Sequence, residues 1–245
     1  MEHLRVYTPP YTKTRIGKNN DGGYIICEID NNYDIFLSGG IEKDISFECD
    51  LLKKYPELKC FAYDGTINGL PINNKVYDRY KRRYVTNISN NDIIKRISFI
   101  KKNLGNTNSD KVSNFAEYFN KYNNIFIKLD IEGGENDLFE SFSDNDLIKI
   151  KQLVIEFHSP NQIIIPTRLA KTHWLVHFHA NNHCKTTNIN GINVPDVFEC
   201  TYIRKDSIDL EYNTDIIPNI IDMPNDKNKP DIIIDYPPFV DKIRT

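Results

Sequence analysis

The feature that most constrains this fold is the alternation of short apolar runs with amphipathic stretches along the chain. Seven runs are candidate strands: Asp34 to Leu37, Cys60 to Tyr63, Ile97 to Ile100, Ile125 to Ile131, Leu153 to Phe157, Trp174 to Phe178 and Val197 to Ile203. Runs such as IFIKLDI and LVIEF are continuously hydrophobic, as in parallel strands that helices cover on both faces. The sequence therefore predicts an α/β fold with a mostly parallel sheet and helices on both faces.

The stretch between the first two predicted strands has helical spacing. Ile45, Cys49 and Leu52 recur on one helical face. Asp44 is the candidate N-cap residue, and Pro56 is expected to end the helix. Together these signals predict a strand, helix, strand unit.

Length and composition favour a single domain over residues 1–245. A chain of 245 residues with 40% hydrophobic residues can bury a sizeable core. Residues 1–33 precede the first core strand, and we expect them to be an N-terminal extension that forms part of the site. Residues 206–245 are rich in Asn, Asp and Pro. We expect an irregular C-terminal tail there, because proline prevents long helices.

Charge and cysteine content argue against several classes of protein. The net charge is −3, with 31 Lys and Arg interleaved among 34 Asp and Glu, so no strongly basic face is indicated for nucleic acid. The five cysteines include no CxxC pair, which argues against a disulfide scaffold or a zinc ribbon. No apolar run approaches signal-peptide or membrane-span length. We expect a cytoplasmic protein with reduced thiols, no membrane span and no nucleic-acid partner.

Residues suited to ligand binding lie at the ends of the first two predicted strands. In open parallel sheets, ligands bind beyond the carboxyl ends of the strands. Gly39 and Gly40 would let the backbone approach a ligand closely before a helix begins. Asp64 is a candidate bidentate acceptor for the ribose hydroxyls of a nucleoside cofactor. The first loop lacks the GxGxxG pattern of a dinucleotide site and carries Glu42 and Asp44. Two acids would repel a pyrophosphate, but they suit the positive sulfonium of S-adenosylmethionine.

Ionisable residues also follow the fourth and fifth predicted strands. Asp130 and Glu132 leave one strand on the same side, and Glu156 and His158 leave the next at the same spacing. Alternatively, these residues could cap helices or form surface ion pairs, which would give them a structural role only. Because neighbouring strands end at one edge, we favour a site there. Asp130, Glu156 and His158 could also bind a divalent metal, since hard oxygen ligands with one imidazole suit magnesium or manganese.

Five of the six histidines fall between residues 158 and 183. His177 and His179 would project from the same strand face, but zinc would require third and fourth ligands, and the adjacent His183 and Cys184 are awkwardly placed to join them. We interpret His179, Asn181 and Asn182 as polar lining of an acceptor pocket. A buried, hydrogen-bonded side chain is the expectation for His177.

Several ordered motifs resemble the FkbM-type methyltransferases: SGGIEKDISFE, FAYDGT, IFIKLDIEGGE, LVIEFH and HFHANN followed by VPDVFECTYIRK. The likeness is to the branch with capsule and viral glycan-modifying members, and with RIGK and DGGY upstream it covers about residues 15–205. It implies a Rossmann-like class I methyltransferase fold, with a seven-stranded sheet whose last strand is antiparallel. The chain departs from the family at Asn136, where many members carry an aromatic residue, and at Ser38, where they carry an acid-x-Gly opening.

Carried over onto this sequence, the resemblance implies roles for the residues at the strand ends. Asp64 would hold the ribose of the cofactor, and Asp130 would stand where the sulfonium meets the acceptor. The full set of candidates comprises cofactor-binding Gly39, Gly40, Glu42, Asp44, Asp64, Gly65, Asn103, Leu104 and Asp130, substrate-binding Arg15, Asp21, Tyr24, Glu132, His179, Asn181 and Asn182, and catalytic His158, Asp130 and Glu156.

These observations predict an S-adenosylmethionine-dependent O-methyltransferase that acts on a hydroxyl of a sugar, nucleotide-sugar or glycan. His158 or a carboxylate would remove the acceptor proton, and an imidazole with a pKa of about 6.5 suits that role. Two alternatives stay open: a methyltransferase for another small hydroxylated molecule, and a non-catalytic Rossmann-like binding module. Salt-dependent binding of RNA or DNA would instead indicate a nucleic-acid methyltransferase.

Overall fold

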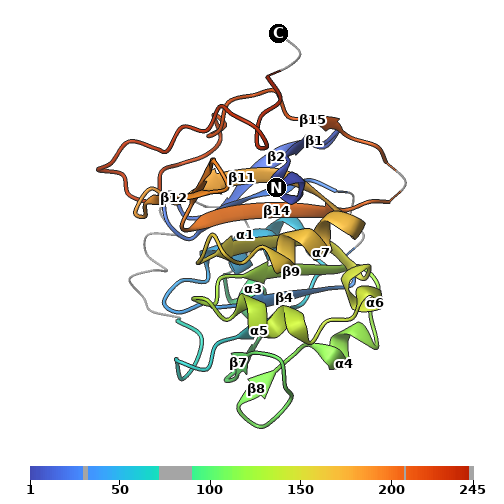
Figure 1. The fold of residues 1–245 in the computed structure, drawn as a ribbon. Helices are drawn as coiled ribbons and strands as arrows, with labels where there is room; N and C mark the ends of the chain where they lie inside the picture. The colour runs from blue at the N-terminus through green and yellow to red at the C-terminus, as the bar shows by residue number, and fades with distance from the viewer. Residues whose placement is uncertain (30–32, 72–89, 207, 243–245) are drawn as a thin grey trace.

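A seven-stranded sheet runs through the centre of the computed structural model, which describes residues 1–29, 33–71, 90–206 and 208–242 (Figure 1). The strand order is β11-β14-β10-β9-β4-β5-β6. The strands are β4 (Ile35–Gly39), β5 (Cys60–Tyr63), β6 (Ile97–Ile100), β9 (Ile125–Leu129), β10 (Ile150–Phe157), β11 (His173–Ala180) and β14 (Phe198–Arg204). Each of them falls on one of the seven runs predicted from the sequence.

All strands of this sheet except β14 run in the same direction. β4 pairs in parallel with β5 and β9, β5 with β6, and β9 with β10. β14 is antiparallel to both of its neighbours, β10 and β11. It is also the last of these strands along the chain. This topology confirms the Rossmann-like class I methyltransferase fold that the sequence resemblance implies.

Helices cover both faces of the sheet, as predicted (Figure 1). One face carries α4 (Ala116–Phe119), α5 (Glu135–Glu140), α6 (Asp144–Leu147) and α7 (Ile164–Thr172), and the other carries α1 (Ser46–Lys54) and α3 (Asn90–Ile94). Because side chains alternate along a strand, Ile127 belongs to the buried cluster that contains Leu138 and Leu169, while its neighbour Phe126 belongs to the cluster that contains Leu51. Each face therefore has its own buried apolar core.

The start of α1 differs by one residue from the prediction. Ile45, not Asp44, is the N-cap residue, and it provides no side-chain cap. Asp44 lies one position upstream, where its Oδ1 accepts a hydrogen bond of 2.9 Å from the backbone N–H of Ser46. The aspartate thus still satisfies a helix N–H, from outside the N-cap position.

The N-terminal extension begins with η1 (Glu2–Leu4) and forms a hairpin of β2 (Lys13–Gly17) and β3 (Gly23–Cys27). The hairpin lies on the α1 side of the sheet. Gln152 of β10 exchanges two hydrogen bonds with the backbone of Cys27, and the Thr201 hydroxyl of β14 donates to the carbonyl of Ile25. These contacts hold β3 across β10 and β14.

The C-terminal segment, residues 208–242, is mostly irregular and packs against the edge strand β11. β15 (Glu211–Tyr212) pairs with β1 (Tyr7–Thr8). Phe239 is fully buried, and its ring centroid lies 4.7 Å from that of Phe178 in β11. The tail is therefore part of the core at this end of the sheet.

Two short ribbons complete the described structure: β7 (Asn103–Leu104) with β8 (Val112–Ser113), and β12 (Thr186–Ile189) with β13 (Ile192–Pro195). All five cysteines are free thiols. Within the described ranges, no helix combines the length and the apolar character needed to cross a bilayer.

Candidate functional site

A cavity of about 730 Å³ opens at the carboxyl edge of the sheet. Its walls follow β4, β5 and β9 and include β7, which is where ligands bind in open parallel sheets. The cavity has the size of a small-molecule site. It is lined by Gly40, Glu42, Tyr63, Asp64, Gly65, Thr66, Lys102, Asn103, Leu104, Asp130, Ile131, Glu132 and Gly134. Of the predicted cofactor residues, only Gly39 and Asp44 are absent from this lining.

Two glycines, the last residue of β4 and the one that follows it, permit close packing of neighbouring strand ends. Gly40 has a φ of +75°, and a Cβ built there would lie 1.6 Å from the carbonyl oxygen of Asp130. A Cβ on Gly39 would lie 2.3 Å from the Leu104 side chain. A larger residue at Gly40 would therefore clash with the backbone that follows β9, and one at Gly39 would displace the side chain of Leu104.

Asp64 organises the loops at one end of the cavity. Its Oδ2 accepts a hydrogen bond of 2.8 Å from the backbone N–H of Glu42. Its Oδ1 accepts from the backbone N–H and the hydroxyl of Thr66, at 2.8 and 2.6 Å. Burial raises the pKa of Asp64, but these hydrogen bonds outweigh burial and leave the pKa below its ordinary value. The carboxylate is therefore charged at neutral pH.

The ionisable groups of the cavity are mainly acidic. Glu42, Asp64, Asp130 and Glu132 line it, with Lys102 as the basic residue of the lining. Asp44, which the sequence placed with them, instead pairs with the amine of Lys18 at 3.2 Å beside the start of α1. This acidic surface attracts cationic ligands and disfavours phosphates.

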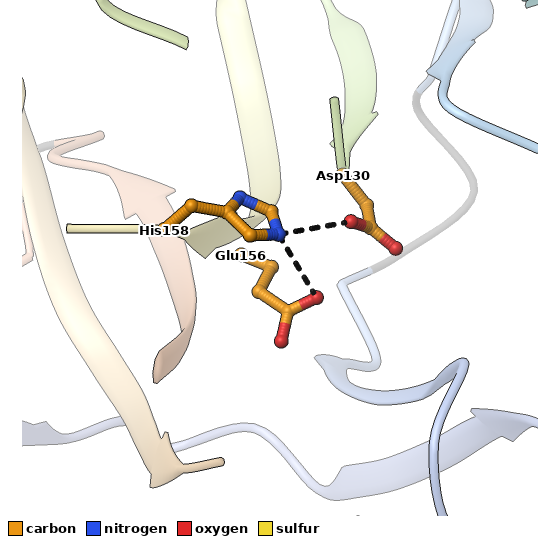
Figure 2. A group of neighbouring side chains, drawn as sticks. All are labelled: Asp130, Glu156 and His158. Atoms are coloured by element: carbon orange, nitrogen blue, oxygen red, sulfur yellow. Dashed lines mark ion pairs between the residues drawn. The ribbon is translucent and has the colours of Figure 1, made fainter. Parts of the chain in front are cut away.

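Three predicted catalytic residues meet next to the cavity, at the ends of β9 and β10 (Figure 2). The Nε2 atom of His158 lies 3.6 Å from Asp130 Oδ1 and 3.8 Å from Glu156 Oε2. The exposed Glu132 places its Oε2 3.5 Å from the same nitrogen. The sequence prediction that these groups converge is therefore matched by the geometry.

Each of these three side chains has a second polar atom that another residue holds. The Tyr24 hydroxyl donates to Asp130 Oδ2 at 2.8 Å, and the Asn181 amide donates to Glu156 Oε1 at 2.9 Å. The Nδ1 atom of His158 lies 3.1 Å from Glu135 Oε1. Asp130 Oδ1, Glu156 Oε2 and His158 Nε2 are thus the atoms left to face one another.

Glu135 and Gln162 are site residues to which the sequence analysis gave no role. Glu135 begins α5 with its side chain fully buried, and its Oε2 accepts 2.9 Å from the Gln162 amide. Gln162 in turn accepts from the backbone N–H of His158 at 2.9 Å. The position of Glu135 in the IEGGE motif, directly after β9, could have marked it as a candidate site residue. Its partner, His158, could be identified only from the fold.

The surrounding carboxylates change the protonation of the cluster. Burial lowers the pKa of His158, but the hydrogen bond to Glu135 and the charges of Glu135, Glu156 and Asp130 raise it to about 9. The expected value of about 6.5 is thus wrong, and the isolated chain carries an imidazolium at neutral pH. Burial and the charges of Asp130 and Glu199 raise the pKa of Glu156 well above its ordinary range.

The predicted acceptor-pocket residues of β11 contact the C-terminal tail. His179 is fully buried between Glu199, at 3.4 Å, and Asp231, at 3.3 Å. His177 is also buried, as expected, and its Nε2 lies 2.9 Å from Asp222 Oδ1. The Asn182 amide donates to three tail carbonyls. His179 and Asn182 therefore hold the tail and do not line the cavity, whereas Asn181 reaches Glu156.

The predicted substrate residues of the N-terminal hairpin separate in the structure. Tyr24 reaches Asp130, as described above. Asp21 is exposed in the turn between β2 and β3. Arg15 donates from Nη2 to the carbonyl of Asn20 at 2.6 Å, while its Nε and Nη1 atoms are buried without a hydrogen-bond partner in the described part of the chain. Only Tyr24 of this group contacts the His158 cluster.

Sequence comparisons give no family for this chain: no family model matches it, and no curated protein matches it. Its fold is similar to that of several solved methyltransferases. Precorrin-6y C5,15-methyltransferase from Geobacter metallireducens is 10% identical, with a TM-score of 0.36 over 70% of this chain and 82% of that one.

Two further solved structures are similar at the same level. TrmK of M. capricolum, in complex with S-adenosylhomocysteine, is 12% identical, with a TM-score of 0.37 over 72% of this chain and 64% of that one. An O-methyltransferase family protein from Burkholderia thailandensis is 10% identical, with a TM-score of 0.34 over 72% and 53%.

Proposed function

We propose that this chain is an S-adenosylmethionine-dependent O-methyltransferase, with the cofactor in the acidic cavity at the carboxyl edge of the sheet. The observation that carries the proposal is the charge of that cavity. Four carboxylates and one lysine line it, which suits a cofactor with a positive sulfonium and ammonium and opposes a pyrophosphate. The class I methyltransferase topology supports the same cofactor.

The cavity supports one orientation of the cofactor. Asp64, at the end of β5, offers a charged acceptor to the ribose, and Asn103 and Leu104 are the proposed neighbours of adenine. Asp130 follows β9, which β4 separates from β5 in the sheet; it lines the same cavity and belongs to the His158 cluster. The sulfonium would then lie near Asp130, between the cofactor cavity and the residues proposed to act on the acceptor.

We propose a hydroxyl of a sugar, nucleotide-sugar or glycan as the acceptor. Methyl transfer to such a hydroxyl removes its proton as the carbon–oxygen bond forms and the carbon–sulfur bond breaks with its electron pair on sulfur. His158 in its neutral imidazole form, or a neighbouring carboxylate, would accept that proton, and in-line alignment of the acceptor with the sulfonium would supply much of the rate. The resemblance to FkbM-type enzymes supports a carbohydrate, and another small hydroxylated molecule is the second candidate.

Ligand-dependent unfolding tests the cofactor assignment. A ligand at about 100 times its dissociation constant stabilises the native state by about 2.7 kcal/mol. S-adenosylmethionine and S-adenosylhomocysteine should therefore raise the unfolding temperature, and NAD should not. Equal stabilisation by NAD, or none by any of the three, would reject the proposal.

Transfer of a labelled methyl group then tests turnover and acceptor class. Incubation with S-adenosylmethionine and separate pools of glycans, small hydroxylated compounds and RNA should label the glycan pool. Cofactor binding without label in any pool would favour the non-catalytic binding module. Label confined to RNA would reject the carbohydrate acceptor.

A further inference from the structure

The cluster of Asp130, Glu156 and His158 has the donor atoms of a cation site. One carboxylate oxygen from each acid and one imidazole nitrogen lie within 4.8 Å of one another. The ligand atoms of an ion with bonds of about 2.1 Å lie about 3.0–3.4 Å apart when neighbouring bonds make angles of about 90–110°. The observed 3.6 and 3.8 Å from His158 Nε2 need side-chain shifts of only a few tenths of an ångström.

The hydrogen bonds at the outer side of the cluster support a cation site more strongly than the distances do. Tyr24, Asn181 and Glu135 each hold the atom of a cluster residue that points away from the centre. Metal-binding histidines usually donate their other N–H to a carboxylate, and metal-binding carboxylates are themselves hydrogen-bonded. With Nδ1 held by Glu135, the Nε2 atom of His158 points at both carboxylates (Figure 2).

The negative charge around His158 also favours the binding of a cation. Four carboxylates, those of Asp130, Glu132, Glu135 and Glu156, have an oxygen within 4 Å of the His158 ring nitrogens. The Glu135 and Glu156 side chains are 0% and 7% exposed. Buried carboxylates are costly unless opposite charge compensates them. Besides His158, the described cation at this cluster is Lys128, whose Nζ lies 3.8 Å from Asp130 Oδ2.

We propose that Asp130 Oδ1, Glu156 Oε2 and His158 Nε2 bind a divalent cation of the manganese and magnesium class, with release of the proton on Nε2 to solvent. Carboxylates suit both ions, and the single imidazole favours manganese over magnesium. Asp130 and Glu132 also line the cavity, so the open coordination positions would face the proposed acceptor. There the cation would hold the acceptor oxygen beside the sulfonium. His158 would then act as a ligand and not as the proton acceptor.

This inference depends on the proposed function only for the role of the ion, and binding can be measured without turnover. The full chain, stripped with EDTA and dialysed, would be titrated with manganese chloride while the free ion is followed by electron paramagnetic resonance. We expect one bound ion per chain. Asp130→Asn and Glu156→Gln should each weaken binding at least about tenfold, and Asp137→Asn, on the exposed side of α5, should bind as the wild type does.

Tyr24→Phe removes only the outer hydrogen bond to Asp130 and should weaken manganese binding about tenfold. It keeps all three ligands, so it tests the proposal even if a ligand variant fails to fold. Failure to bind manganese at millimolar concentration would overturn the site, as would equal binding by wild type, Tyr24→Phe and the folded ligand variants. S-adenosylhomocysteine binding, measured on the same EDTA-treated sample, tests the proposed function separately.

Discussion

Replacement of Asp64 by alanine should weaken S-adenosylhomocysteine binding by about 1.5–3 kcal/mol, which is about 10–150-fold in the dissociation constant. A carboxylate has about four acceptor sites, and Asp64 uses three on Glu42 and Thr66, while the backbone N–H of Ile41 also stabilises its charge. At most one site remains for the ribose. We therefore expect one charge-assisted hydrogen bond, not the bidentate pair expected from the sequence.

Isothermal titration calorimetry of wild type, Asp64→Ala and Thr66→Val would measure this effect. Thr66→Val removes the hydroxyl that donates to Asp64 Oδ1 but keeps the charge, so it should change the affinity less than about threefold. Because Asp64→Ala also leaves the N–H of Glu42 without its partner, thermal unfolding must show that the variant is folded. A folded Asp64→Ala protein that binds within threefold of the wild type would show that Asp64 is only a loop residue.

Three further perturbations have defined outcomes. His158→Ala should lower kcat by about 10²–10⁴-fold with S-adenosylmethionine affinity nearly unchanged; a loss below tenfold, with activity abolished in His179→Ala, would place the acceptor chemistry at β11. Burial lowers the pKa of His173 to about 4, so its stabilising effect is present above pH 6.5 and is lost towards pH 4. Between pH 7 and pH 5 the wild type should lose about 2 kcal/mol of unfolding free energy more than His173→Gln does; equal losses in denaturant titrations would refute this. Phe126→Ala should cost about 3–5 kcal/mol of unfolding free energy, because the ring is fully buried against Phe36, and a cost below 1 kcal/mol would contradict that packing.

The sheet and its ligand-binding edge were predictable because the signals are local. Both Phe126 and Ile127 are buried, on opposite faces of β9, and continuous hydrophobicity is the direct result. Parallel strands end at the same edge, so the approach of Asp130 to His158 followed from strand order alone. Local sequence carried enough information for both inferences.

The features of the site that the sequence did not predict depend on contacts between segments that are far apart in the chain. Glu135 gains its role only when α5 brings it to the ring of His158, where that contact and the charges of Glu156 and Asp130 together raise the pKa of the imidazole to about 9. The sequence predicts His179 as part of a pocket lining, because nothing periodic in the tail indicates that Asp231 covers it. Irregular segments carry no hydrophobic period from which their packing could be predicted.

The central claim is that S-adenosylmethionine binds in the acidic cavity with its sulfonium beside the His158 cluster. A crystal structure of the chain with S-adenosylhomocysteine tests it most directly, because the thioether sulfur marks the position of the reacting methyl group. We predict a ribose hydroxyl within hydrogen-bond distance of Asp64 and the sulfur next to Asp130. Binding of the ligand elsewhere, or an empty cavity in crystals grown at saturating ligand, would contradict the account.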